Sequence, residues 1–128
     1  MFSKLFAYLH YKKHRLQKRE PEVPLFVNGG GCLATDRITV DGEKVGFMYR
    51  VKPSTKNKLD NGWRFFSGDE NQTYINDLKN THPYDTNTIA NLDSAILPYL
   101  DSPYNSAFER IPGMNKFKKV KYDFTNVA

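Results

Sequence analysis

The side chains that could bind a metal ion are few and scattered in this sequence. His10 and His14 are four positions apart, a spacing at which two imidazoles on one helix can share a metal ion. No acid or third ligand accompanies them, and Lys12, Lys13 and Arg15 lie around them. A solvated basic helix face is the better interpretation, so we expect no metal site.

Nucleophiles and acid–base pairs are equally sparse. Asp69 and Glu70 could act as a general acid and base, but adjacent residues on a helix do not face each other. Ser67 to Glu70 has the spacing of a helix capping box, which accounts for both acids. Cys32 is the only cysteine, so it forms no internal disulfide, and we expect it to be buried. The sequence therefore predicts no catalytic residue, no cofactor and no enzymatic activity.

Two further motifs have plain structural explanations. The glycine run that follows Asn28 is not succeeded by a Gly-Lys-Ser/Thr sequence, so a turn is expected rather than a phosphate-binding loop. His82 precedes Pro83, which we expect to interrupt regular secondary structure. His82 is therefore interpreted as a surface residue of a loop.

The length and composition favour one globular domain. The chain has 128 residues, of which 39% are hydrophobic and 14% aromatic, enough to bury a single core. No run approaches the ~20 apolar residues of a membrane span. The first residues do not resemble a signal peptide. We therefore expect a cytoplasmic protein.

The net charge of +5 is concentrated at the two ends of the chain. Residues 1–24 hold six Lys or Arg and two Glu, and residues 111–128 hold four Lys and one Asp. The segment between them holds nine basic and eleven acidic residues, so it is slightly acidic. Its partner cannot be deduced from the basic isoelectric point of the whole chain.

The N-terminal residues predict a separate amphipathic helix. Over residues 2–19, Phe2, Leu5, Phe6 and Leu9 fall on one face at helical spacing. The Pro-containing segment that ends at Pro24 serves as a linker. We therefore divide the chain into a basic helix and linker, residues 1–24, and one α+β domain, residues 25–128.

Strand patterns lie at both ends of this domain and helix patterns lie between them. Asp41-Gly42 predicts a hairpin turn between strands at 38–40 and 45–49. In the next strand, 62–67, Trp63 and Phe65 are expected to point into the core. Further elements are a helix over about 70–79, short helices near 86–92 and 94–100 that Asp85 and Asp93 can cap, and strands at 106–110 and 117–124. This order predicts an α+β fold with an antiparallel sheet of about five strands and helices packed on one face.

Several of these segments resemble a known family. Gly62–Glu70 (GWRFFSGDE) is similar to the immunity protein 33 family, also called domain of unknown function 2185. Other matching pieces lie in the family's order, one before this segment at 40–50 and three after it at 87–91, 96–103 and 106–110. The resemblance implies a protein of bacterial polymorphic toxin systems that neutralises a cognate toxin by stoichiometric binding. No catalytic residue comes with it.

If the resemblance holds, we expect a toxin to contact polar residues at the ends of elements rather than an apolar sheet face. The candidate partner-binding residues are Arg64, Asp69, Glu70, Asn87, Asp101, Glu109 and Arg110. For each of them a purely structural role, such as capping or internal pairing, stays open. The alternative function is a peripheral module that binds a membrane surface or nucleic acid through the basic N-terminal helix and C-terminal strand.

Overall fold

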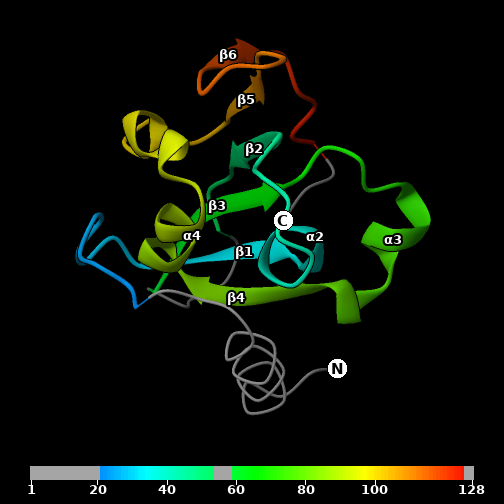
Figure 1. Ribbon diagram of the computed structural model, residues 1–128. Coiled ribbons are helices and arrows are strands. Elements are labelled where there is room, and N and C mark those ends of the chain that lie inside the picture. The colour runs from blue at the N-terminus through cyan, green and yellow to red at the C-terminus, as the bar shows by residue number, and fades with distance from the viewer. Residues whose placement is uncertain (1–20, 54–58, 126–128) are drawn as a thin grey trace.

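One six-stranded sheet organises the protein (Figure 1). The computed structural model describes residues 21–53 and 59–125, so the amphipathic helix expected over 2–19, with His10 and His14, lies outside the described residues. The strand order is β4-β1-β3-β2-β5-β6. The strands are β1 (Gly31–Thr35), β2 (Phe47–Arg50), β3 (Asp60–Phe66), β4 (Thr81–Asp85), β5 (Ser106–Arg110) and β6 (Phe117–Val120).

Short helices connect these strands. They are α2 (Asp36–Thr39), α3 (Gln72–Asn76), η1 (Leu78–Asn80), α4 (Thr86–Leu92) and η2 (Ser94–Tyr99). The expected caps of α4 and η2 are confirmed: the Asp85 side chain accepts from Asn87 N–H, and the Asp93 side chain accepts from Ala95 N–H. The α+β class is also confirmed.

The sheet is mixed, so the expectation of a purely antiparallel sheet is wrong. β1 runs parallel to β3, whereas the other neighbouring pairs are antiparallel. β1 is not predicted by the sequence pattern, because its glycine-rich start is also typical of a turn. The sequence pattern places Ile38 and Thr39 in a strand, but both lie in α2 and are buried. Burial of Ile38 in the core overrides the β preference of such branched residues.

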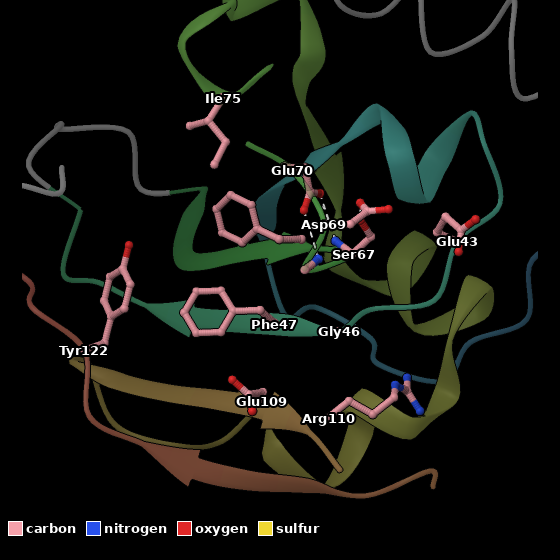
Figure 2. Close-up of a pocket in the computed structure, with 12 residues that line it drawn as sticks. Glu43, Gly46, Phe47, Ser67, Asp69, Glu70, Ile75, Glu109, Arg110 and Tyr122 are labelled. Carbon is pink, nitrogen blue, oxygen red and sulfur yellow. Dashed lines mark hydrogen bonds between the residues drawn. The ribbon is translucent and has the colours of Figure 1, made fainter. Parts of the chain in front are cut away.

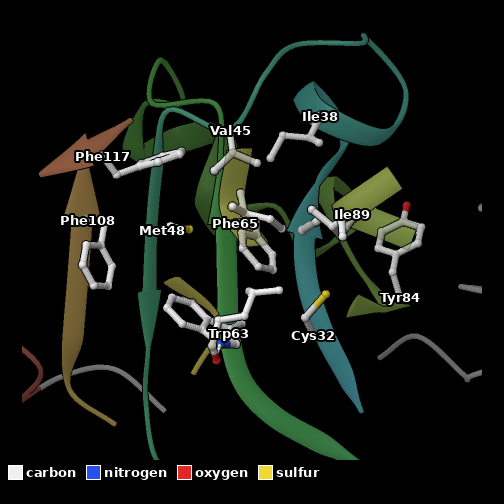
Figure 3. Packing of buried hydrophobic residues seen from close by; sticks show 14 residues of the cluster. Cys32, Ile38, Val45, Met48, Trp63, Phe65, Tyr84, Ile89, Phe108 and Phe117 are labelled. Carbon is white, nitrogen blue, oxygen red and sulfur yellow. Dashed lines mark hydrogen bonds between the residues drawn. The ribbon is translucent and has the colours of Figure 1, made fainter. Parts of the chain in front are cut away.

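One face of the sheet holds the main core and is covered by helices, as expected. Trp63 and Phe65 both point into this core, and the Trp63 indole N–H donates to the Leu100 carbonyl at 3.1 Å. Figure 3 shows the strand side chains meeting those of the helices. The larger members are Met48, Trp63, Phe65, Phe108 and Phe117 from the strands and Ile38, Ile89 and Ile96 from the helices.

His82 and Pro83 lie inside a strand, so the expected interruption of secondary structure at this point is wrong. β4 is an edge strand, where the missing N–H of a proline is tolerated. The His82 side chain is fully buried rather than on the surface. Its Nδ1 lies 3.0 Å from a carboxylate oxygen of Asp36. Packing between β4 and the start of α2 therefore sets the position of this histidine.

Gly62 allows β2 and β3 to approach closely. Its φ is +91°, and a Cβ built on it would lie 1.9 Å from the Val51 carbonyl oxygen. The Val51 N–H donates to the Gly62 carbonyl at 3.0 Å, so the contact is part of the strand pairing. A side chain at this position would have to separate the two strands.

We predict that Gly62→Ala lowers the free energy of unfolding by about 2–4 kcal/mol, because strain at positive φ and steric overlap with Val51 add together. The matched control is Gly113→Ala, which also has positive φ (+73°) but no atom within 4 Å of the new Cβ. It should cost only about 1–2 kcal/mol. Urea denaturation measures both, and equal losses would mean that the close approach contributes nothing.

Candidate partner-binding site

An open groove lies at one end of β2, β3 and β5, with a volume of about 450 Å³ (Figure 2). Its walls come from the segment before β2, the turn after β3, α3 and the residues that follow β6. The volume is in the range of sites that receive small molecules or protruding side chains. The lining residues are Glu43, Gly46, Phe47, Phe66, Ser67, Gly68, Asp69, Glu70, Ile75, Glu109, Arg110 and Tyr122.

Aromatic rings form the floor of the groove. Phe47 and Phe66 are directly paired across β2 and β3, and their ring centroids are 5.9 Å apart. The Tyr122 ring lies 5.3 Å from that of Phe47. Phe47 and Phe66 belong to a second apolar cluster, on the sheet face opposite the main core, which also contains Tyr49. The sequence analysis did not expect apolar surface to remain on that face.

Tyr49 fixes this second cluster. Its ring stacks on Tyr122 with centroids 4.9 Å apart and on Phe66 with centroids 5.5 Å apart. Burial and the neighbouring Tyr122 hydroxyl raise the pKa of Tyr49 to about 12. Its phenol therefore stays protonated and acts as packing, without nucleophilic character.

The turn after β3 carries two carboxylates whose oxygens are already engaged. Glu70 accepts from the Thr35 hydroxyl and from the backbone N–H of Ser67 and Gly68. Asp69 accepts from two guanidinium nitrogens of Arg37, at 3.1 and 2.6 Å. Glu70 thus reaches back as in a capping box, but no helix starts there. α3 begins at Gln72, and Asn71 caps it.

The Arg110 guanidinium is engaged by other groups of the protein, although Arg110 lines the groove. Its guanidinium pairs with the buried Asp93 carboxylate and donates to the carbonyls of Val45 at 2.7 Å and Met114 at 3.0 Å. It also lies over the Phe117 ring, 4.7 Å from the centroid. The groove's own cation is therefore neutralised within the fold.

Glu43 and Glu109 are the acids of the groove with the longest ion-pair distances. The Glu109 carboxylate is 3.7 Å from the Lys118 ammonium, and the Glu43 carboxylate is 3.7 Å from the Arg37 guanidinium. Both distances are long for a charged hydrogen bond, and about half of each carboxylate side chain is exposed. These two groups retain the capacity to accept from a partner.

Four of the seven residues proposed from the sequence lie together here. Asp69, Glu70, Glu109 and Arg110 all line the groove, whereas Asp101 is exposed away from it. What the sequence analysis missed is the aromatic floor and Glu43. The strand expected at 117–124 ends at Val120, so Tyr122 lies just beyond β6, and its contact with the paired Phe47 and Phe66 joins segments that are far apart in the sequence.

Arg64 is buried, so its expected exposed role is wrong. Only 7% of the residue is accessible, and its guanidinium makes a bidentate pair with Asp60, both contacts at 2.9 Å. Burial alone would raise the pKa of the Asp60 carboxyl, but the Arg64 hydrogen bonds and the Gly62 N–H outweigh it and lower that pKa. Arg64 is therefore held inside the fold by Asp60, the first residue of β3.

Asn87 holds the chain's own N-terminal strap, which we define as residues 22–26. Its side-chain oxygen accepts from the N–H groups of Leu25 and Phe26, and its amide nitrogen donates to the Val23 carbonyl. Asn91 forms two more hydrogen bonds with the backbone of Val23. The polar face of α4 is thus occupied by the strap.

The described residues hold neither a cluster of metal-binding side chains nor a helix suited to a membrane. Among them, no three His, Cys, Asp or Glu side chains group as metal ligands would. None of the helices in that part of the chain is long and apolar enough to cross a membrane. Burial raises the pKa of the Cys32 thiol to about 12, so this cysteine is not a thiolate nucleophile.

Comparison with known proteins gives one match. Residues 32–121 match the family described as the immunity protein Imm33 domain. The matched segment contains every strand of the sheet except the first residue of β1. No curated protein and no solved structure gives a significant match to the chain.

We predict that Glu70→Gln destabilises the protein by about 1–2 kcal/mol at pH 7, because one amide cannot accept all three hydrogen bonds. Burial would raise the pKa of Glu70, but the Thr35, Ser67 and Gly68 donors outweigh it and lower that pKa below its ordinary value of 4.5. The stability from the ionised form is therefore present above about pH 4.5 and lost as the pH falls through the lower folded pKa.

The difference between wild type and Glu70→Gln should accordingly shrink in acid. Denaturant titrations between pH 7 and pH 3 test this. Glu43→Gln is the control from the same groove, and we expect it to change stability by no more than about 0.5 kcal/mol. A difference that stays constant with pH would contradict the role assigned to the Glu70 carboxylate.

Proposed function

The chain belongs to the Imm33 family of immunity proteins, and from this premise we propose that it neutralises a cognate toxin by stoichiometric binding at the groove. The observation that carries the proposal is the family match, which covers eleven of the twelve lining residues and stops one residue before Tyr122. The partner is a protein toxin, and binding blocks the surface that the toxin uses. The producing cell's cytoplasm is the proposed site of action.

The character of the groove supports binding rather than catalysis. Its aromatic rings offer apolar area, and its acidic rim is partly solvated, a combination typical of the centre and rim of protein interfaces. The rim charges would increase the association rate and select the partner. The engaged carboxylates of Asp69 and Glu70 hold the wall in place, so little ordering is required when the partner arrives.

A second candidate function uses the basic C-terminal surface. Lys116, Lys118, Lys119 and Lys121 are all exposed. Such a cluster can bind an anionic lipid surface or nucleic acid. Binding to vesicles or DNA that falls steeply with salt would favour this function.

We predict that Glu109→Lys and Tyr122→Ser reduce protection against the cognate toxin. The first reverses a rim charge, and the second removes an aromatic ring of the floor. Each should weaken the complex at least about tenfold, equivalent to about 1.4 kcal/mol. The measurement is growth on co-expression with the toxin encoded beside the chain's gene, followed by calorimetry with the purified toxin domain.

Asp101→Lys is the matched control, since Asp101 is exposed and does not line the groove. Thermal melts identify variants that lose protection only through unfolding. Full protection by stable groove variants, together with loss in Asp101→Lys, would place the toxin contact on another face. A complex without a fixed, small molar ratio of the two proteins would argue against neutralisation by stoichiometric binding.

A further inference from the structure

We propose that the groove receives an arginine side chain from the partner protein, held between the aromatic floor and Glu109. This inference rests on the proposed function and specifies the chemistry of the toxin's contact. The arginine would project from a protruding segment, because the groove is open and larger than one side chain.

The geometry begins with a row of side chains across three strands. Phe66 of β3 is paired with Phe47 of β2, and Phe47 is paired with Glu109 of β5. Directly paired residues on neighbouring antiparallel strands place their side chains on the same face, about 5 Å apart. Figure 2 shows the Glu109 carboxylate below the Phe47 ring and the Tyr122 ring to its left. An aromatic surface thus adjoins a carboxylate within the reach of one guanidinium.

The charges around this row favour a cation. The Arg110 guanidinium is occupied by Asp93 and two carbonyls. The guanidinium of Arg37 in α2 is occupied by Asp41 and by Asp69 of the turn after β3. Glu109 and Glu43 keep only contacts of 3.7 Å. The groove therefore combines two engaged guanidinium groups with two carboxylates that can accept further hydrogen bonds, and a guanidinium at Glu109 would take the place of the exposed Lys118 ammonium 3.7 Å away.

Arginine fits this arrangement better than lysine. Its guanidinium is planar, so it can stack on a ring while its edge donates two parallel hydrogen bonds to a carboxylate. A lysine ammonium lacks the flat face and is more strongly hydrated. The protein uses arginine over aromatic rings elsewhere, since Arg110 lies over Phe117 and Arg50 lies over Tyr104, at 4.7 and 4.8 Å from the ring centroids.

The test uses the full chain and a small probe, N-acetyl-arginine amide. We expect it to shift the NMR signals of the Phe47, Phe66 and Tyr122 rings, with a dissociation constant on the order of 1–10 mM for so small a ligand. N-acetyl-citrulline amide, which has nearly the same shape without the charge, should bind at least about fivefold more weakly. N-acetyl-lysine amide should also bind more weakly than the arginine probe.

Variants assign the contacts. Glu109→Gln and Phe47→Leu should each weaken binding of the arginine probe at least about fivefold, whereas Asp101→Asn should leave it unchanged. Thermal melts check that each variant is folded. If one of them is not, Glu43→Gln replaces it, because Glu43 is the other exposed carboxylate of the groove with a long ion-pair distance. Equal binding of citrulline and arginine, shifts confined to another surface, or no shifts up to 50 mM probe would overturn the inference.

The same variants separate this inference from the proposed function. Loss of toxin protection in groove variants without probe binding would overturn the arginine contact and leave the immunity function standing. Specific probe binding by a chain that protects against no toxin encoded beside its gene would overturn the immunity function and leave the groove's chemistry standing. Substitution of the contacting toxin arginine should weaken binding to wild type by a larger factor than it weakens binding to Glu109→Gln, and that difference would give direct support.

Discussion

The buried ion pair between Arg110 and Asp93 is the contact on which the rest of the architecture depends. The Asp93 carboxylate caps η2 through Ala95 N–H and accepts from Val45 N–H, so one buried group joins the helical layer to the approach of β2. Arg110 completes the junction from the end of β5 through its own bond to the Val45 carbonyl. A carboxylate buried to this degree is tolerated only when charged and neutral donors surround it. The pair therefore fixes the helices relative to the strands that form the groove.

The alternation of a strand explains how adjacent residues in one motif take different roles. Phe108 enters the main core, while Glu109 faces the opposite side of the sheet and stays exposed. Arg110 follows Glu109 at the end of the strand and is engaged in the internal ion pair with Asp93. The Phe-Glu-Arg segment that carries the family resemblance is thus mainly structural, and only its middle residue is available to a partner.

Local patterns in the sequence were enough to predict the elements with short-range causes. Trp63 and Phe65 follow from period-two alternation, and the caps at Asp85 and Asp93 follow from acids placed just before apolar helical turns. The parallel pairing of β1 with β3 could not be predicted in this way, because its partners are about 30 residues apart and no local pattern specifies that pairing. The groove was missed for the same reason: its floor joins side chains from three distant segments, and its place became visible only once strand order was known.

The strap consists of residues 22–26 held mainly through its main chain. Asn87 and Asn91 bind backbone N–H and carbonyl groups, while the side chains of Val23 and Leu25 project into solvent. Hydrogen bonds to the main chain depend on the path of a peptide and depend little on the identity of its side chains. Many side chains are therefore compatible with positions 23 and 25, as long as the Phe26 ring, the Glu22 carboxylate that accepts from Thr88, and the two asparagines persist. Substitutions at these two positions are consequently a poor measure of how far two relatives have diverged in architecture.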